Sequence, residues 1–193
     1  MIKISIGESE VRVVFKILRE NKTIFLIALY LWAFIIVMTL ISTLMQTPIE
    51  NNESFTPVKI QWYKIFLHNV TVALLYIILG NLSFGILAFL LMLFNIYMTS
   101  YAVYYSYMHT GSIGFSTALI FTHGFIEIAA MILCFVISTT TMRWAINRIY
   151  MKTIFNINSV ENKALLFISM VLLYLIASFI ESYISPFLPT KLL

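Results

Sequence analysis

The chain has 193 residues and a formal net charge of +4; 61% of its residues are hydrophobic and 10% are charged. Soluble globular domains carry about 25% charged residues, so this composition excludes a soluble domain and predicts a multi-pass protein of the cell membrane. The basic residues form short clusters beside apolar runs, where they act as topology signals and contact anionic lipid, so nucleic acid is not expected as a partner.

The N-terminal part contains one amphipathic segment and one apolar run. Residues 11–22 place basic side chains on one face of a helix and apolar side chains on the other, which predicts a helix in the membrane interface. Residues 23–45 are apolar over the length of one span, about 20 residues, and predict the first transmembrane helix. The polar residues 46–59 predict a surface loop.

The middle of the chain is almost free of charge. Between Lys64 and Arg143 lie 78 residues with one formal charge, enough for about three spans. Two breaks rich in glycine and polar residues, at 80–85 and 110–114, divide this stretch. The first break is either a tight turn on the cytoplasmic side or a half-membrane re-entrant turn. The predicted spans are 65–82, 85–108 and 116–142.

The remaining elements complete a helical bundle. Ser116 is a suitable N-cap for the span that starts there. Residues 143–155 place Arg143 and Lys152 on one helical face and apolar side chains on the other, which predicts a second interfacial helix. Residues 164–184 predict the fifth span. We therefore expect one all-α domain over residues 1–193, a polytopic membrane helix bundle with about five transmembrane helices and two interfacial helices.

The distribution of basic residues predicts the orientation of this bundle. With five spans, nine of the twelve Lys and Arg residues fall on the N-terminal side of the membrane. The positive-inside rule then places the N-terminus in the cytoplasm and the C-terminus outside. This topology brings His68, His109 and His123 toward the outer leaflet.

The single charge of the apolar stretch is Glu127, four residues after His123. A carboxylate inside a membrane costs about 2.5–3.5 kcal/mol on insertion scales, so it must be neutralised, paired or used. Positions i and i+4 share one face of a helix, so we predict His123 and Glu127 to form a site in the outer leaflet. Four residues are expected to support this site: Gly124, Asn69, Asn95 and Glu181.

Several chemistries could use this pair. Glu127 could orient His123 as a general base. Both could bind a divalent metal such as zinc, with His109 or His68 as further ligands. The pair could also pass protons through the outer half of the membrane. The alternative is a buried structural pair, with Gly124 allowing another helix to approach closely.

A family resemblance rests on the order and spacing of short motifs between Lys64 and Cys134. These motifs are Phe66 to Asn69, the break from Gly80 to Gly85, Phe94 with Asn95, the turn at Gly111 and Gly114, and His123-Gly124 followed by Glu127. In this arrangement the chain resembles the stage II sporulation protein M-like family of integral membrane proteins. The resemblance implies that His123, Gly124 and Glu127 form the site of the family, supported by Asn69 and Asn95. Cys134 is read as a small buried hydrophobe, with a metal-ligand role as the alternative.

The resemblance also implies a role in the cell envelope. Its sporulation member is similar to a partner in a cell-wall remodelling complex, and related proteins accompany the production and export of circular bacteriocins. The leading hypothesis is a module that organises other membrane or envelope proteins, with a second copy of the chain as a further candidate partner. The alternatives are an intramembrane hydrolase or transferase that acts on a lipid-linked or peptide substrate, and a proton-coupled transporter.

Overall fold

The computed structural model describes residues 16, 19–46, 60–157 and 160–184, and within these ranges the chain is helical with no strand. The predicted all-α class is thereby confirmed, and five of the helices are long and apolar enough to cross a membrane. The predicted interfacial helix at 11–22 lies largely outside the described residues. The helices are α2 (Lys22–Leu44), α3 (Trp62–Leu82), α4 (Ile86–Thr110), α5 (Ile113–Ser138), α6 (Thr140–Ile149) and α7 (Val160–Tyr183).

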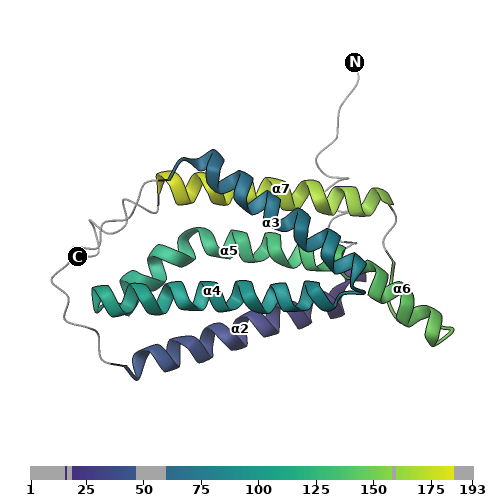
Figure 1. The fold of residues 1–193 in the computed structure, drawn as a ribbon, viewed down its shortest axis with the longest axis horizontal. Helices are drawn as coiled ribbons and strands as arrows, with labels where there is room; N and C mark the ends of the chain where they lie inside the picture. Colours follow the sequence, from purple (N-terminus) through teal and green to yellow (C-terminus); the bar gives the residue numbers. More distant parts are fainter. Residues whose placement is uncertain (1–15, 17–18, 47–59, 158–159, 185–193) are drawn as a thin grey trace, which may run out of the picture.

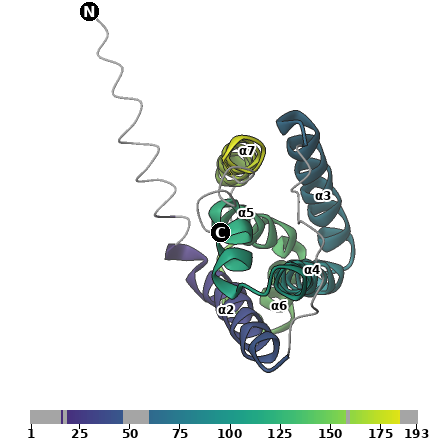
Figure 2. The ribbon, with the colours of Figure 1, turned by 90° about the vertical axis from the view of Figure 1, so that its left-hand side faces the viewer.

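Helix α5 is the centre of the bundle. It packs against α2, α3, α4, α6 and α7, and the view along the bundle shows it surrounded by its neighbours (Figure 2). Half of the residues in its apolar stretch Phe121–Ser138 are buried, against 17% to 28% in the other four candidate spans. Any polar side chain on the middle of α5 therefore lies inside the protein unless its neighbours leave a gap.

Helices α3 and α4 form a tight hairpin. Phe84 and Gly85 in the turn have φ angles of +51° and +87°, the left-handed region that glycine adopts without strain. The two helices meet at this turn and diverge toward their other ends, so that the middle of α5 is visible between them (Figure 1). Because both helices have the length of a full span, the structure favours a turn between two crossing helices over a half-membrane re-entrant turn.

Gly80 allows the close approach that holds the hairpin against α5. A Cβ atom at Gly80 would lie 2.7 Å from Cβ of Ser138 and 2.8 Å from Cβ of Ala88. Small residues let membrane helices approach closely, and no larger side chain fits at this crossing without movement of the backbone.

The boundaries of α5 differ from the predicted span of 116–142. The N-cap is Ser112, whose Oγ accepts a hydrogen bond from the amide of Phe115, whereas Ser116 lies fully buried within the helix. At the other end α5 stops at Ser138. The hydroxyl groups of Ser138 and Thr139 donate to the carbonyl of Phe135 in the preceding turn, a pattern that bends helices, and α6 leaves in a new direction.

The predicted interfacial helix would place Arg143 on an exposed polar face. The structure instead buries this residue. Its side chain is fully buried, and its guanidinium donates to the carbonyl oxygens of Val136, Thr139 and Asn156 and to the side chains of Asn21 and Thr140. Burial lowers the pKa of Arg143 to about 10, so the group stays charged at neutral pH. The carbonyls at the negative end of α5 stabilise this charge, and the contact fixes α6 and the start of α2.

Candidate functional site

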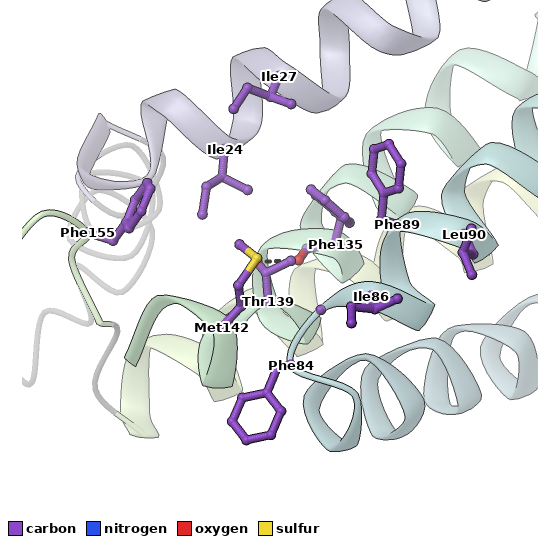
Figure 3. A pocket seen from close by; sticks show the side chains of 11 residues that line it. Ile24, Ile27, Phe84, Ile86, Phe89, Leu90, Phe135, Thr139, Met142 and Phe155 are labelled. Carbon is purple, nitrogen blue, oxygen red and sulfur yellow. Dashed lines mark hydrogen bonds between the residues drawn. The ribbon is translucent and has the colours of Figure 1, made fainter. Parts of the chain in front are cut away.

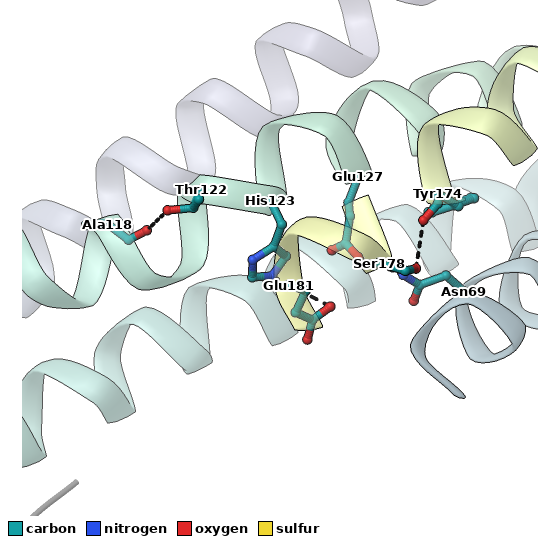
Figure 4. Close-up of polar contacts among 8 residues, drawn as sticks. All are labelled: Asn69, Ala118, Thr122, His123, Glu127, Tyr174, Ser178 and Glu181. Carbon is teal, nitrogen blue, oxygen red and sulfur yellow. Dashed lines mark hydrogen bonds and ion pairs between the residues drawn. The ribbon is translucent and has the colours of Figure 1, made fainter. Parts of the chain in front are cut away.

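The carboxylate of Glu127 faces α3. Its Oε1 accepts a hydrogen bond of 2.7 Å from Nδ2 of Asn69, about two turns from the start of α3 (Figure 4). The other oxygen, Oε2, has no hydrogen-bond partner among the described residues. Asn69 thus compensates part of the cost of burying this carboxylate and joins α5 to α3.

His123, one turn before Glu127, faces α7. Its Nε2 lies 4.0 Å from Oε2 of Glu181, near the end of α7, and the two side chains are 15% and 31% exposed. The structure contains no hydrogen bond between His123 and Glu127. Each member of the predicted pair is therefore directed to a different helix, and the direct contact that a general-base dyad of these two residues would need, one of the chemistries left open for them, is not formed.

The structure does not assemble the predicted metal ligands. Within the described ranges, no three His, Cys, Asp or Glu side chains form a group that could hold a metal ion. Nδ1 of His109 lies 2.9 Å from the carbonyl oxygen of Tyr105 at the end of α4, and its ring packs against the Tyr105 ring. His68 is exposed, because it lies about 100° around α3 from Asn69, which faces α5.

Of two further residues, Asn95 does not lie where it was predicted, whereas Cys134 is buried as predicted. Asn95 donates its side-chain amide to the carbonyl of Leu91 within α4 and does not line the cavity at His123. Cys134 is buried, and its thiol donates to the carbonyl of Ala73 at 3.4 Å, so it contributes to the packing of α5 against α3. Neither residue contacts the pair.

A cavity of about 250 Å³ lies beside His123 and Glu127. Helices α2, α4 and α5 surround it, and its lining residues are Trp32, Met98, Thr99, Ala102, His123, Gly124, Glu127, Ile128 and Met131. A Cβ atom at Gly124 would meet nothing within 4 Å. The predicted close approach of a helix at Gly124 is therefore wrong: the missing side chain leaves open space, while the close approach occurs at Gly80.

Sequence reasoning missed Trp32, which belongs to this wall. It is 2% exposed and lies in α2 within a continuous apolar run, where nothing in the sequence separates it from core residues. Its Nε1–H has no hydrogen-bond partner among the described residues. The packing of α2 against α5 buries this donor and places other atoms of the Trp32 ring in the cavity wall.

The polar groups give this region a negative character. Glu181 of α7 lies beside His123, Glu127 lies one turn further along α5, and among the described residues no Lys or Arg lines the cavity. We define the His123 cluster as Asn69, His123, Glu127 and Glu181. Chemically it can accept hydrogen bonds from, and donate them to, a neutral polar group, whereas an anion would find no Lys or Arg among the described lining residues to compensate its charge.

Comparison with known proteins gives one match. The model of the family described as stage II sporulation protein M matches residues 22–186, which include all five candidate spans. No curated protein and no solved structure matches the chain.

Proposed function

Since the chain belongs to the stage II sporulation protein M family, we propose that it is a non-catalytic membrane module that organises partner proteins for cell-envelope remodelling, secretion or export. The N-terminus lies in the cytoplasm in this proposal, as the basic residues predict. The His123 cluster is then a binding and packing site within the membrane.

The orientation of His123 and Glu127 is the observation that carries this proposal. Glu127 is bound to Asn69 of α3, whereas His123 lies 4.0 Å from Glu181 of α7, so the two residues connect α5 to two different helices. Two hydroxyls of this region are also engaged: Thr122, next to His123 in the chain, donates to the carbonyl of Ala118, and Thr99, which lines the cavity, donates to that of Asn95. Contacts from α5 to both α3 and α7 suit a site that sets helix arrangement and recognition.

The test compares complex formation with function in the same cells. Wild type, His123→Ala and Glu127→Gln are expressed in a strain that lacks the gene, membrane complexes are measured by crosslinking and native electrophoresis, and rescue of the deletion phenotype is scored. Complex abundance and rescue are expected to fall in parallel. A variant that forms the full complex but gives no rescue would contradict the proposal.

A hydrolase or transferase is the second candidate, and the cavity beside Glu127 is the observation that favours it. A reaction at this site would need room for water or substrate, and about 250 Å³ provides it. Turnover of a lipid-linked or peptide substrate by purified protein, lost in Glu127→Gln at unchanged folding, would establish this reading. A proton-coupled transporter receives less support, because apolar side chains such as Met92, Ile132 and Met170 fill the core between the His123 cluster and Arg143.

A further inference from the structure

Two cavities lie where α2 and α4 run side by side along the bundle (Figure 1). The first, of about 380 Å³, lies near the start of both helices, where Ile24 and Ile27 of α2 and Phe89 and Leu90 of α4 line it (Figure 3). The second, of about 540 Å³, lies between the later halves of the same two helices. We define the α2–α4 seam as the lining of these two cavities. It contains no residue of the His123 cluster.

The α2–α4 seam follows one face of each helix. Its lining residues recur at spacings of three, four or seven residues, which place side chains in one line along a helix. On α4 this line contains Leu90, Tyr97 and Tyr101. On α2 the lining extends from Ile24 to Thr43, a rise of about 29 Å, against about 30 Å for the hydrocarbon core of a bilayer. The seam therefore has almost the length of a complete membrane span.

The two cavities of the seam differ in polarity. Among the described residues that line the first cavity, only Thr139 is polar, and its hydroxyl donates to the carbonyl of Phe135. The second cavity is lined by the exposed residues Ser42, Tyr97 and Tyr101, whose hydroxyls have no hydrogen-bond partner in the described part of the chain. No Asp, Glu, Lys or Arg among the described residues lines either cavity. The groups that can select a partner are therefore uncharged hydroxyls.

Tyr97 is the residue that contact with lipid does not explain. It lies about 17 Å from the start of α4 and about 20 Å from its end, near the middle of the span, and it is 61% exposed. Tyrosines at the ends of spans reach the headgroups, which accounts for Tyr105. In the middle of the bilayer there is no water, and acyl chains carry no hydrogen-bond acceptor. The hydroxyl of Tyr97 therefore needs a polar partner inside the membrane.

A transmembrane helix supplies such a partner at this depth. Helices associate in membranes through van der Waals packing and through hydrogen bonds of Ser, Thr, Asn and Gln side chains. The acyl chains of a lipid could fill both cavities, but they would leave the hydroxyl of Tyr97 unpaired, and a polar lipid headgroup stays at the membrane surface. The length of the seam and the depth of Tyr97 thus both suit a helix.

The shape of the seam favours a different protein over a second copy of this chain. In a two-fold symmetric dimer the same surface of both copies meets, so the cavities would face each other and stay unfilled. A second copy that inserted another of its helices would leave its own seam free for the next copy, which produces an open chain of subunits. A helix of a separate protein fills the seam in a closed complex.

We infer that the α2–α4 seam binds one transmembrane helix of a partner protein, which fills both cavities and presents an uncharged hydrogen-bond acceptor to the hydroxyl of Tyr97. This inference rests on the proposed function, because it states which kind of partner the module holds and where. Apolar side chains of the partner helix occupy the first cavity, and an Asn, Gln, Ser or Thr side chain lies beside Tyr97.

Photocrosslinking in cells tests the seam in the full chain. The photoreactive amino acid benzoylphenylalanine replaces Tyr97 or, as the control, Leu172. Leu172 is 52% exposed and lies about 18 Å along α7, whose described residues contact neither α2 nor α4. We expect an adduct from position 97 alone, with the linked residue inside an apolar span of another protein, as identified by mass spectrometry. Adducts with lipid or a second copy only, or equal yields at both positions, would overturn the assignment.

A defined probe measures the role of the Tyr97 hydroxyl. The probe is a peptide of about 20 leucines with one central asparagine, and the all-leucine peptide is its reference. In native mass spectrometry, wild type is expected to bind the asparagine peptide about three- to eighteenfold more tightly than the reference, and Tyr97→Phe to abolish this preference. Tyr105→Phe removes an exposed hydroxyl outside the seam and should keep it. No preference in wild type, or an equal one in Tyr97→Phe, would contradict the inference.

A blocking variant separates this inference from the proposed function. Ser42→Trp places a ring in the second cavity, whereas Leu44→Trp adds the same ring on the opposite face of α2. Only Ser42→Trp is expected to lose the crosslink from position 97, the complexes and the rescue of the deletion strain. If it loses crosslink and complexes but still gives rescue, the seam stands and the organising role fails. If position 97 crosslinks only lipid while His123→Ala loses complexes and rescue together, the seam assignment fails and the proposed function stands.

Discussion

The two polar clusters buried in this bundle are satisfied to different degrees. Around Arg143, the guanidinium uses all five of its N–H donors on carbonyl and side-chain oxygens. In the His123 cluster, Glu127 has one hydrogen bond among the described residues, His123 lies 4.0 Å from Glu181, and a cavity of about 250 Å³ adjoins them. The first arrangement holds the fold together, while the second leaves binding capacity in the membrane.

This difference shows how a charge inside a membrane protein can be interpreted. A buried guanidinium and a buried carboxylate both lose their hydration, so the cost of burial does not distinguish them. Their hydrogen-bond partners and the space beside them indicate whether the group stabilises the fold or can bind a ligand. A saturated group in a packed site has no free capacity for a ligand. An unsaturated group beside a cavity is a candidate for recognition.

Removing the saturated cluster should have the largest effect. Arg143→Met removes the guanidinium that donates to the carbonyls of Val136 and Thr139 and to the Asn21 side chain, and is expected to lower the free energy of unfolding by about 3–5 kcal/mol. Denaturant unfolding in micelles measures this change. Arg148→Met, on the exposed side of the same helix, is the control and should change stability by less than about 0.5 kcal/mol. Similar losses in both variants would remove the distinction between the clusters.

The glycines sharpen the contrast between packed and open sites. Gly80→Ala places a methyl group 2.7 Å from Cβ of Ser138 and should cost about 1–3 kcal/mol of stability. Gly124→Ala adds the same methyl group to open space and should be neutral or stabilising by up to about 1 kcal/mol, because alanine favours the helix. Thermal unfolding of the two variants gives the comparison, and a larger loss for Gly124→Ala would show that its cavity is closed.

A smaller effect is expected for the single contact that joins Glu127 to α3. A double-mutant cycle with Asn69→Ala and Glu127→Ala should give a coupling energy of about 0.6–1.7 kcal/mol, the range found for polar contacts between membrane helices. His68→Ala changes the neighbouring, exposed residue and should show no coupling to Glu127. Zero coupling for Asn69 would mean that Glu127 has another partner in the membrane.

Much of the helical layout could be predicted from the sequence, because apolar length and glycine breaks are local signals. The five spans, the family and the tight turn near Gly85 are of this kind. The end of α5 was misplaced, since Ser138 and Thr139 carry no charge that would signal a boundary. Arg143 was read as interfacial because charge at the end of a span usually meets water, and its burial depends on Asn21, which is distant in sequence.

The site was predictable only where a charge stood out from its surroundings. Glu127 and His123 could be singled out, and Asn69 and Glu181 were expected nearby, but their pairing depends on how α3 and α7 are rotated about their axes. The same rotation turned His68 outward and kept the predicted metal ligands apart. Trp32 had no distinguishing signal, because an unpaired indole becomes evident only when its neighbours are in place.

The central position of α5 also has a consequence for synthesis in the cell. Helices α2, α3 and α4 precede it in the chain, so at about 5–20 residues per second the first of them waits roughly several seconds for the helix on which it packs. When Glu127 enters the bilayer, Asn69 has already been made and can receive its carboxylate, whereas α7 arrives last. The order of the helices in the chain therefore places Asn69 in the membrane before Glu127, the carboxylate to which it donates.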